Sequence, residues 1–281
     1  IDAARAAGDH DELANALVRL GGVLVRRGEA ERAEAVLTEA LELSTRHGNL
    51  RGQAMAAGNL GRVAYRRGAY DVALRYQLTA LDRFRSAGYD IGVARTLTNL
   101  AIVRKARREL TEALRDLAEA REICQRCDAA DAAARVEGTM AGIHRMQGKL
   151  AEADAAYRSA IDLFRSFGDR LGEATALSQL GLVRSDQGRP DQAIELHEEA
   201  LRIFTAVGDE GGTIDTLLSL GTALRGAGRH VSAARCHQEA LERAAAVGDR
   251  GQVARAHGEL AADHAASAAL PESDSLGAQA L

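Results

Sequence analysis

The sequence predicts an all-α fold, a solenoid of antiparallel helix pairs, and three observations predict it. Glycine recurs every 40 residues, as at Gly48 and Gly88. Between these glycines, apolar residues follow the three- and four-residue spacing of one helix face. The same period holds at several other positions of the repeat, with no insertion or deletion over six repeats. A fixed period of this length is typical of repeat architectures.

Five columns of residues define the repeat. Two are glycine columns, one is a leucine column, and two are alanine columns. They comprise Gly8, Gly48, Gly88, Gly168, Gly208 and Gly248; Gly28, Gly68, Gly148, Gly188 and Gly228; Leu20, Leu60, Leu100, Leu180, Leu220 and Leu260; and the alanines that start from Ala33 and Ala40. Arg108 and Asp128 stand at glycine slots, and Met140 stands at a leucine slot.

Each repeat is predicted to form two helices of about 17–18 residues, because glycine stops the helical pattern twice in each period. Leu17, Leu20 and Leu24 mark one face of the first helix, and Leu37 and Leu41 mark the second. Glycine then ends the helix, and the Asp or Asn that follows is expected to cap the next one.

The predicted solenoid covers residues 1–267. Six repeats run from residue 8 to 247, the end of an earlier repeat precedes them, and a capping helix follows over 249–266. Ile1 aligns with Leu41 inside a second helix, so we expect further protein upstream. Residues 268–281 lack the repeat pattern, and we expect a disordered tail there.

Small residues mark the seam where the two helices of a repeat meet. Gly21, Gly61, Gly181 and Gly221, with Ala101 and Ala141, recur on the first helix, and the column of Ala33 faces them from the second. Small residues on both sides allow helix axes to approach near 8 Å. One pair cannot bury its apolar stripe alone, so the repeats must stack.

These positions resemble the tetratricopeptide repeat, whose usual period is 34 residues. The matching residues of one unit are Leu17, Leu20, Gly21, Leu24, Ala33, Leu37 and Ala40. The longer period of 40, with Asn59-Leu60-Gly61 inside it, is similar to repeats of Pins-type spindle adaptors, kinesin light chains and the C-terminal arrays of actinobacterial antibiotic regulators and related signalling ATPases. The resemblance implies a right-handed superhelix whose first helices line a concave groove.

Composition excludes several classes of function. The chain has 36 basic and 40 acidic residues, a formal net charge of −4, which argues against a general nucleic-acid binder. Three cysteines do not make a disulfide framework, and no apolar run is long enough to span a membrane. We therefore expect a cytoplasmic protein without a membrane partner. RNA binding through arginines stays an alternative, although few aromatic residues are available for base stacking.

Two groups of residues could suggest chemistry, and their columns favour a structural role. Cys124 and Cys127 have the spacing of a redox pair or half a zinc site. Their slots hold apolar residues in other repeats, namely Phe84, Phe164 and Phe204 for the first and Phe167, Val207 and Val247 for the second. We interpret both as apolar packing positions, with a redox or metal role as the alternative.

His197 and His237 share one column and are interpreted as partly buried structural residues. No phosphate-binding loop or hydrolase motif appears, so we expect no enzyme and no cofactor.

The candidate site is the face of the first helices opposite their packing stripe. Relative to Leu20 and its equivalents, we assign to this face the positions five, two and one before and two, five and six after. Over six repeats the face carries nine basic residues against Asp186 and Asp215. The predicted groove residues are Arg19, Arg26, Asn59, Arg62, Arg66, Arg95, Asn99, Lys105, Arg135 and Arg145.

This face predicts a binding module for an acidic, extended peptide or partner surface. Arginine pairs well with carboxylates, and an amide such as Asn59 or Asn99 both donates to and accepts from a peptide backbone. The resemblance implies the sensor or scaffold part of a larger bacterial regulator, whose upstream domains would be further partners. A stand-alone scaffold that assembles a multiprotein complex is the alternative. A solvated arginine-rich face is the simpler interpretation of the same charges.

Overall fold

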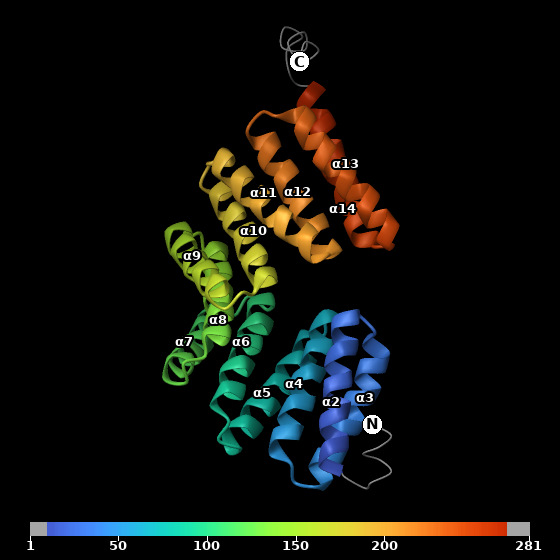
Figure 1. Cartoon of the computed structure of the whole chain (residues 1–281), viewed down its shortest axis with the longest axis vertical. Coiled ribbons are helices and arrows are strands. Elements are labelled where there is room, and N and C mark those ends of the chain that lie inside the picture. The colour runs from blue at the N-terminus through green and yellow to red at the C-terminus, as the bar shows by residue number, and fades with distance from the viewer. Residues whose placement is uncertain (1–9, 269–281) are drawn as a thin grey trace. The chain divides into compact units, whose positions relative to one another are not determined.

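The computed structural model describes residues 10–268, apart from the Arg26 side chain, and that range folds into thirteen α-helices without a strand (Figure 1). They are α2 (His10–Arg27), α3 (Ala30–Arg46), α4 (Leu50–Arg66), α5 (Tyr70–Ser86), α6 (Asp90–Ala106), α7 (Leu110–Arg126), α8 (Ala130–Met146), α9 (Leu150–Ser166), α10 (Arg170–Asp186), α11 (Pro190–Val207), α12 (Glu210–Gly226), α13 (His230–Val247) and α14 (Arg250–Ala268). The predicted all-α repeat solenoid is confirmed. The predicted capping helix corresponds to α14, and the predicted tail lies outside the described residues from residue 269 onward.

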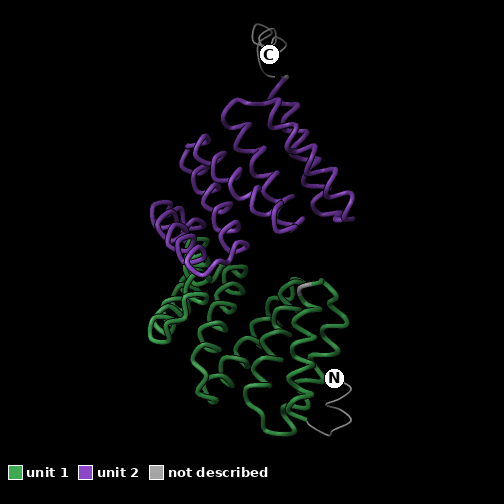
Figure 2. Tube along the Cα trace, viewed as in Figure 1, with its two compact units in different colours: residues 1–143 green, residues 144–281 purple. Residues whose placement is uncertain are grey.

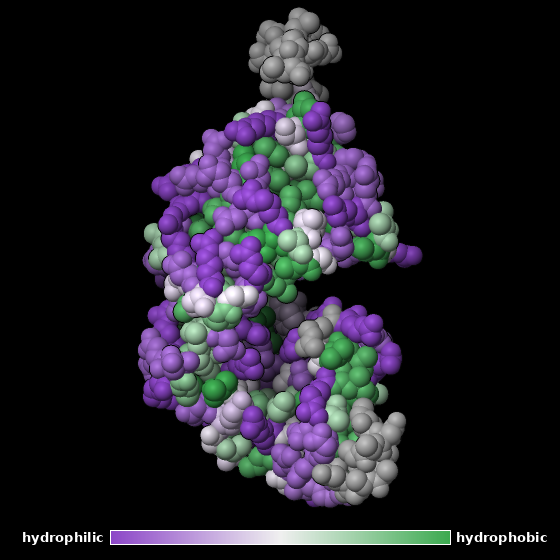
Figure 3. Space-filling view, in the orientation of Figure 1, coloured by the Kyte–Doolittle hydropathy of each residue, from purple (hydrophilic) through white to green (hydrophobic). Residues whose placement is uncertain are grey.

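The chain divides into two compact units, residues 1–143 and 144–281 (Figure 2). In unit 1, each helix from α2 to α7 packs against the next along the chain, and the first helices α2, α4 and α6 also contact their neighbours of the same kind. In unit 2, α9 to α14 pack in the same way, with α10, α12 and α14 in contact. Hydrophilic residues cover most of the visible surface of each unit, with smaller hydrophobic patches between them (Figure 3).

A residue with left-handed backbone ends each helix, every 20 residues from Gly28 to Gly248. Ten of these positions are glycine, which adopts positive φ without a steric penalty. Arg108 (φ 65°) and Asp128 (φ 50°) take the same conformation, at a cost of about 1 kcal/mol each. Arg108 and Asp128 therefore end their helices with the same left-handed backbone geometry as the glycines of the other repeats.

In four of the six repeats the seam leaves no room for a side chain at the glycine of the first helix, and Ala101 and Ala141 hold this position in the other two. A Cβ atom at these glycines would lie closer than 3 Å to a large side chain of the second helix. The pairs are Gly21 with Leu37 at 2.4 Å, Gly61 with Gln77 at 2.6 Å, Gly181 with His197 at 2.7 Å and Gly221 with His237 at 2.4 Å. The alanines of the two second-helix columns, such as Ala33 and Ala40, are fully buried beside this seam.

The two histidines of the seam are fully buried, not partly buried as predicted. His237 has hydrogen-bond partners: its Nδ1 lies 2.5 Å from Asp263 Oδ2, and its Nε2 lies 3.1 Å from the Leu218 carbonyl oxygen. Asp263 also accepts a hydrogen bond from Arg225 at 2.8 Å. Because Asp263 belongs to α14 and is itself buried, this network fastens α14 to α12 and α13.

His197 is buried without such a network, since neither ring nitrogen has a hydrogen-bond partner among the described residues. Burial lowers the pKa of His197 to about 4. An ordinary histidine in the unfolded chain binds a proton near pH 6.5. Between these two values the unfolded state takes up a proton that the folded state does not, so folding stability falls as the pH falls.

We predict that His197→Leu removes this sensitivity to acid. Leucine occupies the same column at Leu37 and Leu117, so the seam accepts its shape. For the natural chain, this histidine should lower the free energy of unfolding by about 2 kcal/mol between pH 7 and pH 5. Urea unfolding at both pH values measures the effect, with the exposed His257→Leu as the control. An unchanged pH dependence in His197→Leu would contradict the assignment.

We also predict that Gly61→Leu separates the helices of its repeat. The new side chain meets Gln77 and the backbone oxygen of Ala73, where a Cβ would already lie 3.3 Å away. Overpacking of this kind costs about 1–3 kcal/mol. Gly58→Ala on the same helix is the control, because its Cβ meets nothing closer than 3.8 Å. Hydrogen exchange should show lost protection near α4 and α5, and uniform loss over all helices would refute a local seam.

Candidate functional site

Five of the ten predicted groove residues line one hollow in unit 1, with a volume of about 340 Å³. Asn59 and Arg62 reach it from α4, Arg95 and Asn99 from α6, and Arg135 from α8. The register of the repeat explains this convergence, because Asn59 and Asn99 are 40 residues apart and so occupy the same place on neighbouring first helices. Both asparagines are half-buried.

The floor of the hollow is apolar and small residues shape it. Met55, Phe84 and Tyr89 contribute to the lining, and the rings of Phe84 and Tyr89 lie 5.6 Å apart. Gly92 allows this packing, because a Cβ there would lie 2.4 Å from Tyr89 and 2.6 Å from Phe84.

The asparagine amides present polar atoms toward the hollow. Asn59 accepts a hydrogen bond of 3.3 Å from Arg62 through its Oδ1. Within the described residues, Asn99 makes no hydrogen bond with its side chain, although that side chain is half-buried. An amide in that situation offers both a donor and an acceptor to a ligand.

Positive charge dominates the lining. Among the residues that the structure describes, the lining holds four arginines, Arg51, Arg62, Arg95 and Arg135, and no carboxylate. Arg95 forms an ion pair with Asp131 at 3.0 Å, and both side chains are about half exposed. Exposed pairs of this kind contribute little to stability and exchange readily for another anion.

Arg51 and Tyr89 are among the residues of the hollow that the sequence pattern did not indicate. The Arg51 guanidinium carbon lies 3.9 Å from the centroid of the Tyr89 ring, a cation–π contact. Tyr89 stands in the column where Asn49 and Asp169 accept hydrogen bonds from Gly52 N and Gly172 N, and it provides no such cap. This departure from the capping column was the signal available in the sequence.

The other predicted groove residues do not line this hollow. Arg19 pairs with Glu12 at 2.8 Å, and Arg66 donates to the backbone oxygen of Val25. Lys105 is half-buried, and burial lowers its pKa. Arg145 belongs to unit 2, where it pairs with Asp186 at 2.6 Å. The Arg26 side chain lies outside the described residues.

The predicted face also needs a correction. The position two residues before the leucine column was assigned to the groove, but Val18, Thr98, Ser178 and Leu218 are all buried. These side chains point into the packing between helices, because the apolar stripe of a first helix contacts both its partner helix and the next repeat. The exposed part of the face is therefore narrower than the sequence pattern indicated.

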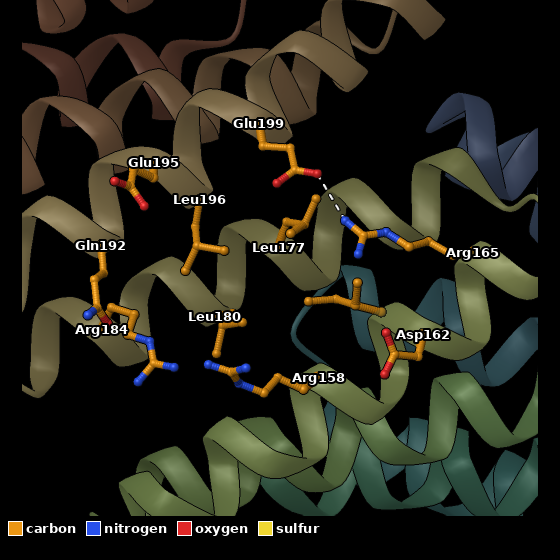
Figure 4. A pocket seen from close by; sticks show the side chains of 11 residues that line it. Arg158, Asp162, Arg165, Leu177, Leu180, Arg184, Gln192, Glu195, Leu196 and Glu199 are labelled. Atoms are coloured by element: carbon orange, nitrogen blue, oxygen red, sulfur yellow. Dashed lines mark hydrogen bonds and ion pairs between the residues drawn. The ribbon is translucent and has the colours of Figure 1, made fainter.

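A second hollow, of about 480 Å³, lies in unit 2 between α9, α10 and α11 (Figure 4). Leu177 and Leu180 form part of its lining, and charged residues of α9 and α11 face one another across it. Two of its arginines pair with carboxylates of neighbouring helices: Arg165 with Glu199 at 2.9 Å, and Arg184 with Asp154 at 2.6 Å. In the second hollow these two arginines thus join neighbouring helices.

The cysteine pair Cys124 and Cys127 lies at the core of unit 1. Cys124 is buried in the core of unit 1, where burial raises its pKa, and Cys127 packs against the same cluster. Three residues in the Cys127 column were predicted to be packing positions, and here the prediction is wrong: Phe167, Val207 and Val247 are 40–55% exposed at helix ends.

Within the described range, no group of three or more potential ligands could hold a metal ion. That range also holds no helix long and apolar enough to cross a membrane.

The tetratricopeptide repeat model matches residues 52–126, 92–166 and 131–206, which together cover more than half of the chain. The chain belongs to the tetratricopeptide repeat family. Arrays of this family are protein-interaction scaffolds and are generally non-enzymatic. The tetratricopeptide register places the hollow on the first helices of consecutive repeats. No curated protein sequence matches the chain.

Three solved structures illustrate the likeness of the tetratricopeptide fold. BtubC from P. vanneervenii is 20% identical with a TM-score of 0.67, over 78% of this chain and 92% of that one. A signal-transduction ATPase with a tetratricopeptide repeat sensor from Pyrococcus horikoshii is 14% identical with a TM-score of 0.70, over 89% of this chain and 38% of that one. The Rap conjugation gene regulator of plasmid pLS20, in complex with the Phr* peptide, is 14% identical with a TM-score of 0.63, over 88% of this chain and 71% of that one.

Proposed function

We propose that this tetratricopeptide array is a non-enzymatic binding module whose unit 1 hollow holds an acidic, extended segment of a protein partner. The observation that carries the proposal is the convergence of Asn59, Asn99 and arginines from three helices on one hollow without a lining carboxylate among the described residues. An extended peptide presents a backbone donor and acceptor at each residue, which the two amides match. Its acidic side chains match the arginines, which pair with carboxylates in a fixed geometry.

The repeat register supports an extended ligand over a compact one. Asn59 and Asn99 hold equivalent places on α4 and α6, so a chain crossing the two helices meets the same group twice. An extended segment leaves its backbone groups unpaired, whereas a helix has already paired them. The apolar floor of Met55, Phe84 and Tyr89 gives a neighbouring apolar side chain a place to bury.

The wider role follows from what similar folds do. The Rap structure holds a bound peptide, and the Pyrococcus ATPase uses its repeat array as a sensor. By analogy, we place this array as the sensor or scaffold part of a larger cytoplasmic regulator in a bacterium. Such a role needs binding and no catalysis, in keeping with the absence of hydrolase and phosphate-loop motifs from the sequence.

A double charge reversal tests the proposal. Short fluorescein-labelled peptide pools of acidic, neutral and basic composition are titrated by fluorescence anisotropy against the whole chain. The acidic pool should bind best, weaken as salt rises, and lose about tenfold in affinity in the variant that combines Arg62→Glu with Arg95→Glu. Neither side chain is buried, so the circular dichroism spectrum should not change.

The matched control combines Arg75→Glu with Arg115→Glu. These arginines are exposed on the second helices α5 and α7 of the same unit, so the control changes the net charge equally. The control should bind the acidic pool as the natural chain does. Equal loss in both variants would show general electrostatic attraction, and no loss in either would show that the hollow does not bind the peptide. Either result overturns the proposal.

A further inference from the structure

The hollow carries more positive charge than one carboxylate would neutralise. The lining arginines Arg51, Arg62, Arg95 and Arg135 bring four positive charges, and the neighbouring Asp131 removes one. Three positive charges remain in one small hollow. A single aspartate or glutamate side chain supplies one negative charge, so it would leave the site unbalanced.

Two of these arginines keep their N–H donors available for a ligand. Arg51 rests over the Tyr89 ring, and a cation–π contact engages none of its N–H groups. The Arg135 side chain is exposed and forms no hydrogen bond or ion pair within the described part of the chain. Guanidinium groups in that state can donate two parallel hydrogen bonds to one anion.

At Tyr89 the chain gives up a helix cap, and this loss lowers the stability of α6. In the same column, Asn49 and Asp169 cap their helices with hydrogen bonds of 2.8 and 2.9 Å, and α6 has no side-chain cap at Tyr89. The surrounding geometry would accept a cap: Gly92 packs against Phe84 as Gly172 packs against Phe164. In place of a cap, the Tyr89 ring packs against Phe84 and under the Arg51 guanidinium, so the position holds an arginine at the hollow.

We propose that the hollow recognises a phosphorylated side chain, phosphoserine or phosphothreonine, within the bound acidic peptide. This inference rests on the proposed function and names its ligand class. A phosphate carries close to two negative charges at pH 7 and three acceptor oxygens, so it neutralises more of the residual charge than one carboxylate does and matches the donors of Arg51, Arg95 and Arg135. Tyr89 holds Arg51 in place for this contact.

The corresponding slots of unit 2 lack these features, which makes the site specific to unit 1. Shifted by 120 residues, the slots of Arg51 and Arg62 hold Leu171 and Leu182, and those of Tyr89 and Arg95 hold Asp209 and Asp215. The slot of Arg135 holds Arg255, which already pairs with Asp215 at 2.6 Å. A phosphate would meet apolar side chains and carboxylates at those slots.

The test uses three fluorescein-labelled peptide pools with the same degenerate acidic flanks and a central phosphoserine, glutamate or serine. The phosphoserine pool should bind the whole chain about tenfold more tightly than the glutamate pool at pH 7. The advantage should shrink at pH 5, because the second phosphate proton binds near pH 6. Variants Arg51→Gln and Arg135→Gln should each reduce the advantage, and the exposed Arg75→Gln should keep it.

Equal binding of the phosphoserine and glutamate pools would overturn the phosphate inference and leave the proposed function standing. Failure of all pools to distinguish the natural chain from the double charge reversal would overturn both. Free phosphoserine and inorganic phosphate are titrated alongside. If either binds as tightly as the phosphoserine pool, the site takes a small anion and the peptide inference is wrong.

Two substitutions give readouts that a merely structural role would not produce. Tyr89→Asp should restore the helix cap and raise the thermal midpoint while it abolishes the preference for phosphoserine, because a carboxylate enters the hollow. Asp131→Asn should strengthen binding of the phosphoserine pool, because it removes the anion that competes for Arg95. A more stable Tyr89→Asp variant that still prefers phosphoserine would overturn the inference.

Discussion

The close approach of the two helices within each repeat, at a small residue of the first helix, is the constraint on which the rest of the structure depends. At Gly21, Gly61, Gly181 and Gly221 a single Cβ atom would collide with the opposing side chain. Ala101 and Ala141 hold the same position in the other two repeats and are fully buried. This contact sets the rotation of each first helix about its own axis. The same rotation recurs wherever the seam recurs, so residues 40 apart present the same face. A surface site can then be assembled one residue per repeat, as with Asn59 and Asn99.

The site arises where individual repeats depart from their shared pattern. Tyr89 replaces a capping residue, and Arg51 and Arg62 are the only arginines in their columns. Because neighbouring repeats in a solenoid support one another, one repeat can lose a cap while the array stays folded. Unit 2 shows the other use of charge, since its arginines join α9, α10 and α11 through ion pairs (Figure 4). The same residue type therefore stabilises one part of the array and is exposed to ligands in another.

Repeat columns made the fold readable from the sequence, because each helix boundary, seam glycine and buried alanine is repeated several times. Single departures from a column were harder to interpret. The column of Phe167 looked like core and lies at exposed helix ends, since apolar character alone does not distinguish a helix end from its packing face. Arg145 and Arg19 carry the charge expected of groove residues, but in the structure they pair with Asp186 and Glu12. A count of charges along one face does not show which arginines are already paired. The hollow itself required the positions of Phe84, Tyr89 and Arg51 relative to one another.

The most direct measurement of the central claim is nuclear magnetic resonance of the side-chain amide groups during titration with an acidic peptide pool. Asn59 and Asn99 lie in the hollow, and Gln179 occupies the same column in unit 2, where it serves as an internal reference. We expect the NH₂ signals of Asn59 and Asn99 to shift together, with one saturation curve, while the Gln179 signal stays in place. Shifts at Gln179 with none at Asn59 and Asn99 would contradict a peptide site in unit 1.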